Sequence, residues 1–502
     1  MGKHSKYSIA LIAGACSVAS SVAFAEQVTI VLDTEPEQLE LCQSARSQVG
    51  KVVRQNIGET LTEIDPSTGD ITPRLATSWT QLEPTKWKFE LREGVKFHDG
   101  SDFDADALVY AIQRTLDPDM ACENRVKYFD GFELTAKAVG PHTVELSTSD
   151  PVPILPTLMG TMAIMSPSTP MGEPSRAPVG TGPYVFAAWE PGQQIELERF
   201  DGYWGDTPQV TGATYVWRGE SAVRAAMIET GEADIAANIA IQDATNPEMD
   251  FSYLNSETSR LRIDTQIGAL EDVRVRKALN HALDREALVG SILPQDVILA
   301  TQLVGPSING HNPNPKPYSY DPALARQLLD EARADGVDVD AGIVLIGRHN
   351  IYPNAFEVMQ AIQAMYADVG LDVSLTMTEA AEWFELLVKP FAEDREPNLL
   401  QSQHDNNNGD AVFTVFAKYH SDGGQSTISD AEVDRLIEEA GKATGAERRS
   451  LYQEMFARLH DEIVPDVYMF HMVGFTRVGP RLNFQPSIAT NSELQLSQIS
   501  LR

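Results

Sequence analysis

A run of polar side chains in the last quarter of the chain is the segment best suited to hold a solute. His404, Asp405, the three asparagines at 406–408 and Asp410 follow a strand predicted over 398–401. Ligands of open α/β sheets bind beyond the ends of such strands, so these carboxylates and amides could line a cleft. An Asn- and Gly-rich surface turn is the other interpretation, and the residues alone leave both open.

Histidines gather in the same part of the chain. They are His404, His420, His460 and His471. Two of them together with Asp405 or Asp410 could bind a metal ion, because imidazole and carboxylate groups are common metal ligands. Their spacing matches no metal-binding motif, and ordinary surface or core histidines explain them better. We therefore predict no metal site and no cofactor.

Catalytic motifs are absent from the sequence. The stretch 305–310 places Ser307 between glycines, but its spacing does not fit a nucleophile elbow. Neither a zinc-binding His-Glu-x-x-His helix nor a phosphate loop occurs. Acidic residues are so common that no pair of carboxylates stands out as an acid/base couple. We predict that the protein is not an enzyme.

The charge of the chain excludes some classes of partner. Its 502 residues include 39 Lys and Arg against 72 Asp and Glu, a formal net charge of −33. So acidic a chain repels phosphate, which argues against nucleic acid and anionic membranes. Hydrophobic residues make up 42% and charged residues 22%, as in ordinary soluble proteins. The length predicts about three domains or lobes.

Residues 1–25 are typical of an export signal. Lys3 and Lys6 precede a small, apolar stretch over 7–22, and the Ala-Phe-Ala at 23–25 fits a cleavage site before Glu26. Cys16 offers a weaker lipoprotein cleavage box, and we prefer cleavage after residue 25. No later segment reaches the roughly 18 apolar residues of a membrane span. We expect a mature protein in the periplasm.

Two cysteines remain after this cleavage, Cys42 and Cys122. In an oxidising compartment they could form a disulfide, which would close a long loop and stabilise the fold by about 4 kcal/mol. Two buried free thiols are the alternative, because the sequence does not show whether the two side chains meet.

The elements that must position the polar segment differ in order between the two halves of the chain. Strands are predicted over 28–32, 86–91, 184–189, 195–199 and 234–239, with helices over 221–230 and from a Ser101–Asp104 capping box to Pro118. A Pro-rich crossing spans 151–183. Beyond it, helices over 273–283, 322–334, 354–369, 430–440 and 446–461 alternate with strands over 342–346, 371–376 and 466–470. This alternation predicts an α/β fold.

Three stretches of the chain match motifs of one known family. The first comprises RLATSW at 74–79, WKFELREGVKFHDG at 87–100 and ADALVY at 105–110. The second is PVGTGPY at 178–184 with DGYW at 201–204, and the third is VRVRKALNHALDR at 273–285. All three resemble the bacterial extracellular solute-binding protein family 5, the peptide/nickel class of ABC-transporter binding proteins. The resemblance covers nearly the whole mature chain.

This resemblance implies a two-lobed α/β periplasmic binding protein of type II, in the large cluster with an extra subdomain. Residues 26–57, 178–266 and 475–502 would form lobe I, residues 58–177 its extra subdomain, and residues 267–474 lobe II. The lobes would close over a solute by a hinge motion and deliver it to ABC permease subunits in the inner membrane. We expect a monomer.

The resemblance also points to residues of the binding site. Peptide-binding members carry a Trp-x-x-Asp stretch whose acid pairs with the α-ammonium group of the peptide. Asp405 matches that acid and Asp410 a later Asp, but Ser402 stands in place of the Trp, Ala411 in place of a Pro, and one residue is extra. We therefore expect a peptide or another amine-bearing solute.

The residues predicted to bind the solute are Asp405, Asp410, His404, Asn406, Asn407, Asn408, Tyr419 and Trp383. Core packing is the alternative for Tyr419, on a short helix, and for Trp383. Two alternative functions stay open: a nickel or metal-chelate binding protein of the same family, and a secreted hydrolase on the same scaffold.

Overall fold

The computed structural model describes residues 2, 26–120, 122–349, 351–352, 354–406 and 409–502. The predicted export signal, apart from Gly2, lies outside these residues, as do Asn407 and Asn408 of the predicted site. Of Asp405 only the backbone is described.

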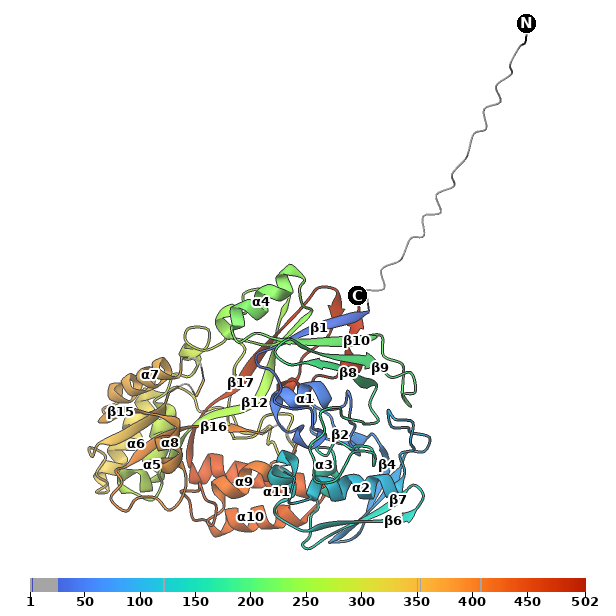
Figure 1. The fold of residues 1–502 in the computed structure, drawn as a ribbon. Helices are drawn as coiled ribbons and strands as arrows, with labels where there is room; N and C mark the ends of the chain where they lie inside the picture. Colours follow the sequence, from blue (N-terminus) through green and yellow to red (C-terminus); the bar gives the residue numbers. More distant parts are fainter. Residues whose placement is uncertain (1, 3–25, 121, 350, 353, 407–408) are drawn as a thin grey trace.

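One mixed sheet of eleven strands runs through the molecule (Figure 1). Its order is β15 (Val373–Thr378), β14 (Ile343–Arg348), β16 (Asn398–Asp405), β12 (Asp250–Ile263), β17 (Asp466–Val478), β11 (Ile235–Ile239), β1 (Gln27–Leu32), β10 (Gly212–Trp217), β9 (Gln194–Arg199) and β8 (Tyr184–Glu190), with β13 (Ile298–Leu299) beside β17. β1 is parallel to β10 and β11, and β14 is parallel to β15 and β16. The α/β prediction is confirmed.

The helices of the second half of the chain form two separate groups (Figure 1). Around β14–β16 lie α5 (Val273–His281), α6 (Pro322–Ala334), α7 (Ala355–Asp368) and α8 (Ala380–Leu387). A second group contains α9 (Val412–Tyr419), α10 (Ala431–Lys442) and α11 (Gly445–Arg458). The spacing of apolar residues predicts five of these helices to within a few residues, and α6 has the predicted bounds. The two groups of helices have separate hydrophobic cores, and α8 packs in a further small cluster.

Most of the first half of the chain shares one large core, while α4 (Ser221–Thr230) and part of β11 pack in a smaller one. The large core joins β1 and α1 (Ser47–Val53) to a four-stranded sheet in the order β4 (Ala76–Glu83), β5 (Lys86–Leu91), β7 (Thr143–Thr148) and β6 (Leu134–Gly140). The remaining elements are β2 (Thr62–Ile64), β3 (Ile71–Pro73), α2 (Ala105–Leu116), α3 (Leu155–Met159), β18 (Leu482–Asn483) and β19 (Ser500–Leu501). β2 and β3 form a hairpin.

The predicted start of α2 is wrong. Asp104 is the N-cap, and its carboxylate accepts a hydrogen bond from the Ala107 N–H at 2.9 Å. Ser101 is instead held in the preceding turn, where its hydroxyl and N–H both donate to Asp99. A carboxylate at the N-cap serves the helix as well as a serine would.

β12 and β17 are the long strands that connect the two ends of the sheet. They span 14 and 13 residues, whereas the sequence predicts only 466–470 of β17 and nothing of β12. β12 escapes prediction because its segment DFSYLNSETSRLRI mixes polar and apolar residues without a clean alternation. The two strands lie between the β14–β16 end and the β1–β11 end of the sheet, and the predicted lobe bounds stay a prediction.

Cys42 and Cys122 meet in a small buried cluster. Both are free thiols, and the Cys122 thiol donates a hydrogen bond to the Cys42 carbonyl at 3.2 Å. A hydrogen bond from the neighbouring thiol, together with burial, raises the pKa of Cys42. Whether the pair is oxidised stays a prediction, which labelling of the unfolded, unreduced protein with maleimide would test.

Among the described helices, none has the length and the apolar character needed to cross a membrane.

Candidate functional site

The backbone is irregular along part of the ladder between β12 and β17. Their pairing shifts register between Leu254 and Thr258. Within the shift, Ser256 has a φ of 70°, a left-handed conformation that residues with side chains seldom adopt. Register shifts of this kind bend a strand locally. The shift is therefore a point at which the long central strand β12 departs from regular geometry.

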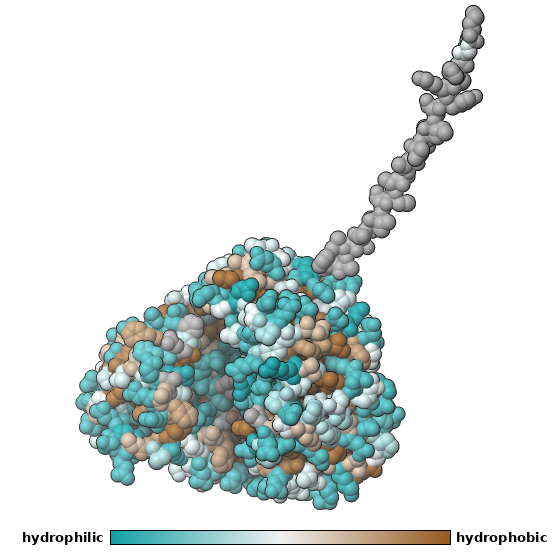
Figure 2. All heavy atoms as spheres, in the orientation of Figure 1, coloured by the Kyte–Doolittle hydropathy of each residue, from teal (hydrophilic) through white to brown (hydrophobic). Residues whose placement is uncertain are grey.

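A cavity of about 430 Å³ lies beside this register shift. Its walls come from the first lobe, the subdomain and the shift itself, and include Asp33, Ser47, Gln48, Lys51, Lys127, Asn238, Tyr253, Asn255, Ser256, Glu257 and Asn491. The face of the molecule drawn in Figure 2 is hollowed between the lobe that holds α5–α8 and the first lobe. The cavity walls are mostly polar, with two acids and two lysines.

Lys51 is the most deeply buried charged residue of this wall, with 3% of its surface exposed. Its ammonium donates to Ser47 Oγ at 3.3 Å, and among the described residues no carboxylate lies within 4.0 Å of it. Burial lowers its pKa to about 8, against the opposing effect of Asp33. Asp33 Oδ1 and Gln48 Oε1 are also buried and accept no hydrogen bond from the described residues.

β16 reaches farther than the sequence predicts, so His404 and Asp405 are its last residues. In the ladder with β12, Asp405 stands opposite Glu257, and His404 stands opposite Thr258. The carboxylate of Glu257 accepts a hydrogen bond from Gln403 Nε2. The pairing therefore sets the position of Asp405 beside that of Glu257, and the side chain of Glu257 lines the cavity.

His404 and Asn406 hold the loop that follows β16. His404 Nε2 lies 2.6 Å from Thr414 Oγ1, and Asn406 Nδ2 donates to Thr414 Oγ1 at 2.9 Å and to the Asp410 carbonyl at 3.1 Å. Burial, with help from nearby Lys418, holds the pKa of His404 well below its ordinary value. His404 is therefore neutral at physiological pH.

Asp410 is engaged in a buried ion pair. Its two oxygens accept hydrogen bonds from Arg448 Nη2 at 2.7 Å and Nε at 2.9 Å, and also from Asn309 and the Val412 N–H at 2.9 Å. Asp410 and Arg448 are each about 3% exposed. Burial alone would lower the pKa of Arg448, but the charge of Asp410 raises it overall. These contacts tie β16, α9 and α11 together.

The two predicted aromatic residues lie in packed surroundings. Tyr419 is 1% exposed, and its hydroxyl donates to Asp466 at 2.7 Å. Trp383 is 7% exposed, and its indole N–H donates to the Gln401 carbonyl at 2.7 Å. The guanidinium of Arg348 stacks over the Trp383 ring at 4.9 Å.

Arg348 is a candidate that the sequence reasoning missed. It is the last residue of β14, and its Nε is buried without a partner among the described residues. The available signal was its position, two residues beyond the predicted strand 342–346, at the kind of strand end where ligands bind. Lys51 carries no such signal, since no predicted strand end or motif adjoins it in the sequence.

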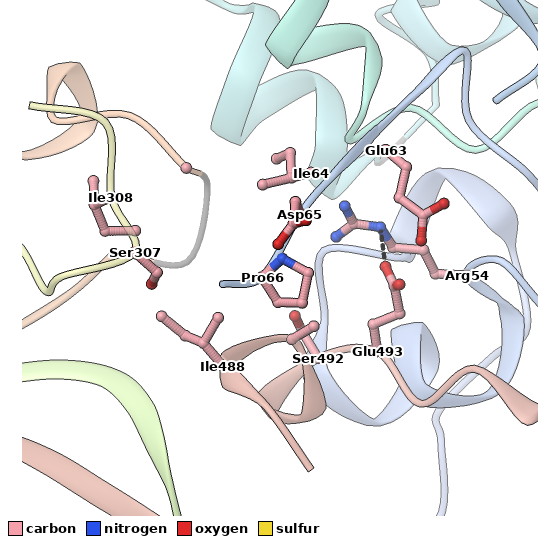
Figure 3. A pocket seen from close by; sticks show the side chains of 12 residues that line it. Arg54, Glu63, Ile64, Asp65, Pro66, Ser307, Ile308, Ile488, Ser492 and Glu493 are labelled. Atoms are coloured by element: carbon pink, nitrogen blue, oxygen red, sulfur yellow. Dashed lines mark ion pairs between the residues drawn. The ribbon is translucent and has the colours of Figure 1, made fainter. Parts of the chain in front are cut away.

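The lobes also touch at the tip of the β2–β3 hairpin. Figure 3 shows Ile64, Asp65 and Pro66 facing Ser307 and Ile308 of the second lobe, with a space of only about 30 Å³ between them. Such a space holds one or two water molecules and no solute.

Glycine is required at the hairpin tip. Gly69 has a φ of 72°, and a Cβ there would lie 2.3 Å from the Ser307 carbonyl oxygen. Next to it, Arg449 Nη2 forms an ion pair with Asp70 at 2.9 Å. A second contact between the lobes joins Phe413 and Tyr128, edge to face at 6.2 Å.

The four histidines considered as metal ligands have separate surroundings. His404 contacts Thr414, His471 contacts Thr258, His420 stacks on Phe416 and His460 on Tyr318. Within the described ranges, no group of three or more His, Cys, Asp or Glu residues is arranged to hold a metal ion.

The chain matches the family model "Bacterial extracellular solute-binding proteins, family 5 Middle" over residues 70–426. It is 28% identical over 457 residues to the dipeptide-binding protein of Escherichia coli (strain K12), covering 83% of this chain and 84% of that protein. It is 31% identical over 327 residues to the glutathione-binding protein GsiB of the same strain, or 61% of each chain.

Among solved structures, a protein of Bacillus halodurans described as a nickel ABC transporter is similar in fold. The TM-score is 0.81 with 23% identity, over 94% of this chain and 99% of that one. The match of the family model to well over half of the sequence decides the assignment, and the two-lobed sheet agrees with it. The chain belongs to family 5 of the bacterial extracellular solute-binding proteins, the substrate-binding components of ABC importers.

Proposed function

We propose that this chain captures a peptide or another small solute with a free amino group, in the periplasm, and delivers it to ABC permease subunits. The observation that supports the proposal is the strand register that pairs Asp405 with Glu257, whose side chain lines the cavity. An ammonium group between two carboxylates forms charge-assisted hydrogen bonds, each contributing about 1.5–3 kcal/mol. Dipeptides and glutathione, for which two relatives are named, both carry a free amine.

The requirement for a free amino group on the solute is tested by a thermal-shift screen of dipeptides and tripeptides against the purified protein. Calorimetry of the tightest binder follows. We expect N-acetylation of that peptide to abolish measurable binding, because acetylation removes the positive charge. Mass spectrometry of solutes that co-purify with the protein gives an independent identification. Equal binding of the free and acetylated peptides would contradict the proposal.

Asp405→Asn tests the residue itself. We expect the affinity for the unmodified peptide to fall by roughly tenfold to a hundredfold, equivalent to about 1.5–3 kcal/mol. The melting temperature of the empty protein should stay nearly unchanged. Asn406→Asp is a poor control because Asn406 holds the loop, so Asp422→Asn, an acidic surface position beyond α9, is the matched variant. Equal calorimetric affinities of wild type and Asp405→Asn would reject the role.

Export is proposed from the sequence at 1–25. Expression of the full chain in a Gram-negative host should yield a periplasmic protein whose N-terminus is Glu26. Intact-mass measurement after osmotic shock checks this, and a lipid-modified Cys16 would instead favour the lipoprotein box.

A further inference from the structure

Lys51 has fewer polar partners than the buried arginines Arg448 and Arg224. Buried Lys418 also has one hydrogen bond among the described residues, to Gln425 Oε1, but it does not line this cavity. Arg448 is paired with Asp410, and Arg224 donates to three carbonyl oxygens, those of Arg218, Gly219 and Asn238. Among the described residues Lys51 has a single hydrogen bond, to Ser47, although an ammonium group offers three donors. Burial of a charge without a partner is costly. The two remaining donors of Lys51 are therefore suited to an acceptor that arrives with a ligand.

Acceptors without donors lie in the same wall. Asp33 Oδ1 and Gln48 Oε1 are buried and unpaired among the described residues, and both side chains line the cavity with Lys51. A ligand group that complements all three must offer a negatively charged acceptor next to N–H donors. The C-terminal residue of a peptide has this composition, a carboxylate two bonds from an amide N–H.

We infer that the first-lobe cavity binds the carboxylate end of the solute, with Lys51 as its cationic partner and Asp33 and Gln48 as acceptors for the adjacent N–H. The inference rests on the proposed function and adds the second end of the ligand and its orientation. The carboxylate then lies toward α1, which holds Lys51, and the amine toward Glu257 of β12 and the end of β16. A ligand held at both ends favours the closed arrangement of the lobes.

The charges that line the cavity are balanced, which favours a ligand without a net charge. Asp33, Glu257, Lys51 and Lys127 all line it, and Arg224 acts on Lys51 from α4. Because the two acids offset the two lysines, a phosphate dianion is disfavoured relative to a carboxylate, and a metal cation is repelled by Lys51. The pocket therefore fits a zwitterionic solute.

The test compares one peptide in two forms, the tightest binder from the peptide screen as free acid and as C-terminal amide, against three proteins. In wild type we expect amidation to weaken binding at least tenfold. In Lys51→Met, free acid and amide should bind equally. Lys137→Met, which removes an exposed lysine of β6 that does not line the cavity, is the matched control and should still discriminate between the two forms. Circular dichroism of the empty Lys51→Met protein checks that it is folded.

Proton uptake gives a second readout. At pH 8, near the pKa of Lys51, binding of the free acid should take up more protons in wild type than in Lys51→Met, where only the α-amino group of the peptide contributes, as measured by calorimetry in buffers of different ionisation enthalpy. A tenfold preference for the free acid that persists in Lys51→Met overturns the inference but leaves the proposed function intact. Failure of every free-amine peptide to bind wild type overturns both.

Discussion

Two buried cationic residues, Arg448 and Lys51, differ in how their positive charge is compensated. In the second lobe, Arg448 is held by both oxygens of Asp410, which Asn309 and the backbone also bind. In the first lobe, Lys51 has one long hydrogen bond to Ser47 beside an open cavity. The first arrangement stabilises a loop. The second leaves part of the charge available to a ligand.

The difference teaches how to separate structural from binding residues in this molecule. Both Asp410 and Lys51 are conspicuous as charged residues inside the protein, yet only the side chain with unused hydrogen-bonding capacity gains from a solute. By this criterion Lys51, Asp33 and Arg348 are stronger candidates than Asp410, whose oxygens are already occupied.

The largest expected effect is on stability. Asp410→Ala leaves the Arg448 guanidinium buried without its partner, and we expect the free energy of unfolding to fall by about 3–5 kcal/mol, measured by urea denaturation. The double variant Asp410→Ala with Arg448→Met should recover much of this loss. A stable Asp410→Ala protein with weakened solute binding would break the comparison, because Asp410 would then be a binding residue.

The opposite sign is expected at Lys51. Its folded-state pKa of about 8 lies below the unfolded value near 10.5, so at pH 7 the charge opposes folding. Lys51→Met should therefore raise the unfolding free energy of the empty protein at pH 7, by on the order of 3 kcal/mol at most. Between pH 8 and 10.5 the Lys51 ammonium group of wild type loses its proton on folding. The difference in unfolding free energy between the variant and wild type should therefore decrease over this range. A pH-independent difference in urea denaturation would argue against a buried charge.

The smallest effect is expected at the exposed contact between the lobes. Asp70→Ala removes the ion pair with Arg449, whose side chains are 63% and 45% exposed. Such pairs contribute about 0–1 kcal/mol, and less as salt is added. We expect an unchanged melting temperature and a slight increase of the radius of gyration at low salt, seen by small-angle X-ray scattering. A large loss of stability would mean that this contact behaves like Asp410 and Arg448.

The sequence predicts much of the fold because local spacing determines it. The helix Pro322–Ala334 has its predicted bounds, since a proline at the first turn and a regular apolar face define it. β12 is not predictable in this way, because its polar residues are accommodated by pairing with β16 and β17, which are remote in sequence.

The candidate site is predictable only in part. Asp405 can be located by its position after a strand, but its register with Glu257 depends on a partner 148 positions earlier along the printed sequence. The role of Asp410 depends on Arg448, 38 residues away, and no local pattern links the two. Lys51 cannot be found from its type, since an unpaired buried lysine looks the same in sequence as a solvated one.

The pairing of β12 with β17 has an evolutionary consequence. Both halves of β12 pair with β17. A genetic crossover near residue 256 would therefore take the first half of β12 from one parent and β17 from the other. In a chimera of this protein and a relative, the paired residues of β12 and β17 would therefore not match unless both strands came from the same parent. New specificities in such a scaffold are expected to arise by side-chain replacement along the cleft rather than by shuffling of lobes.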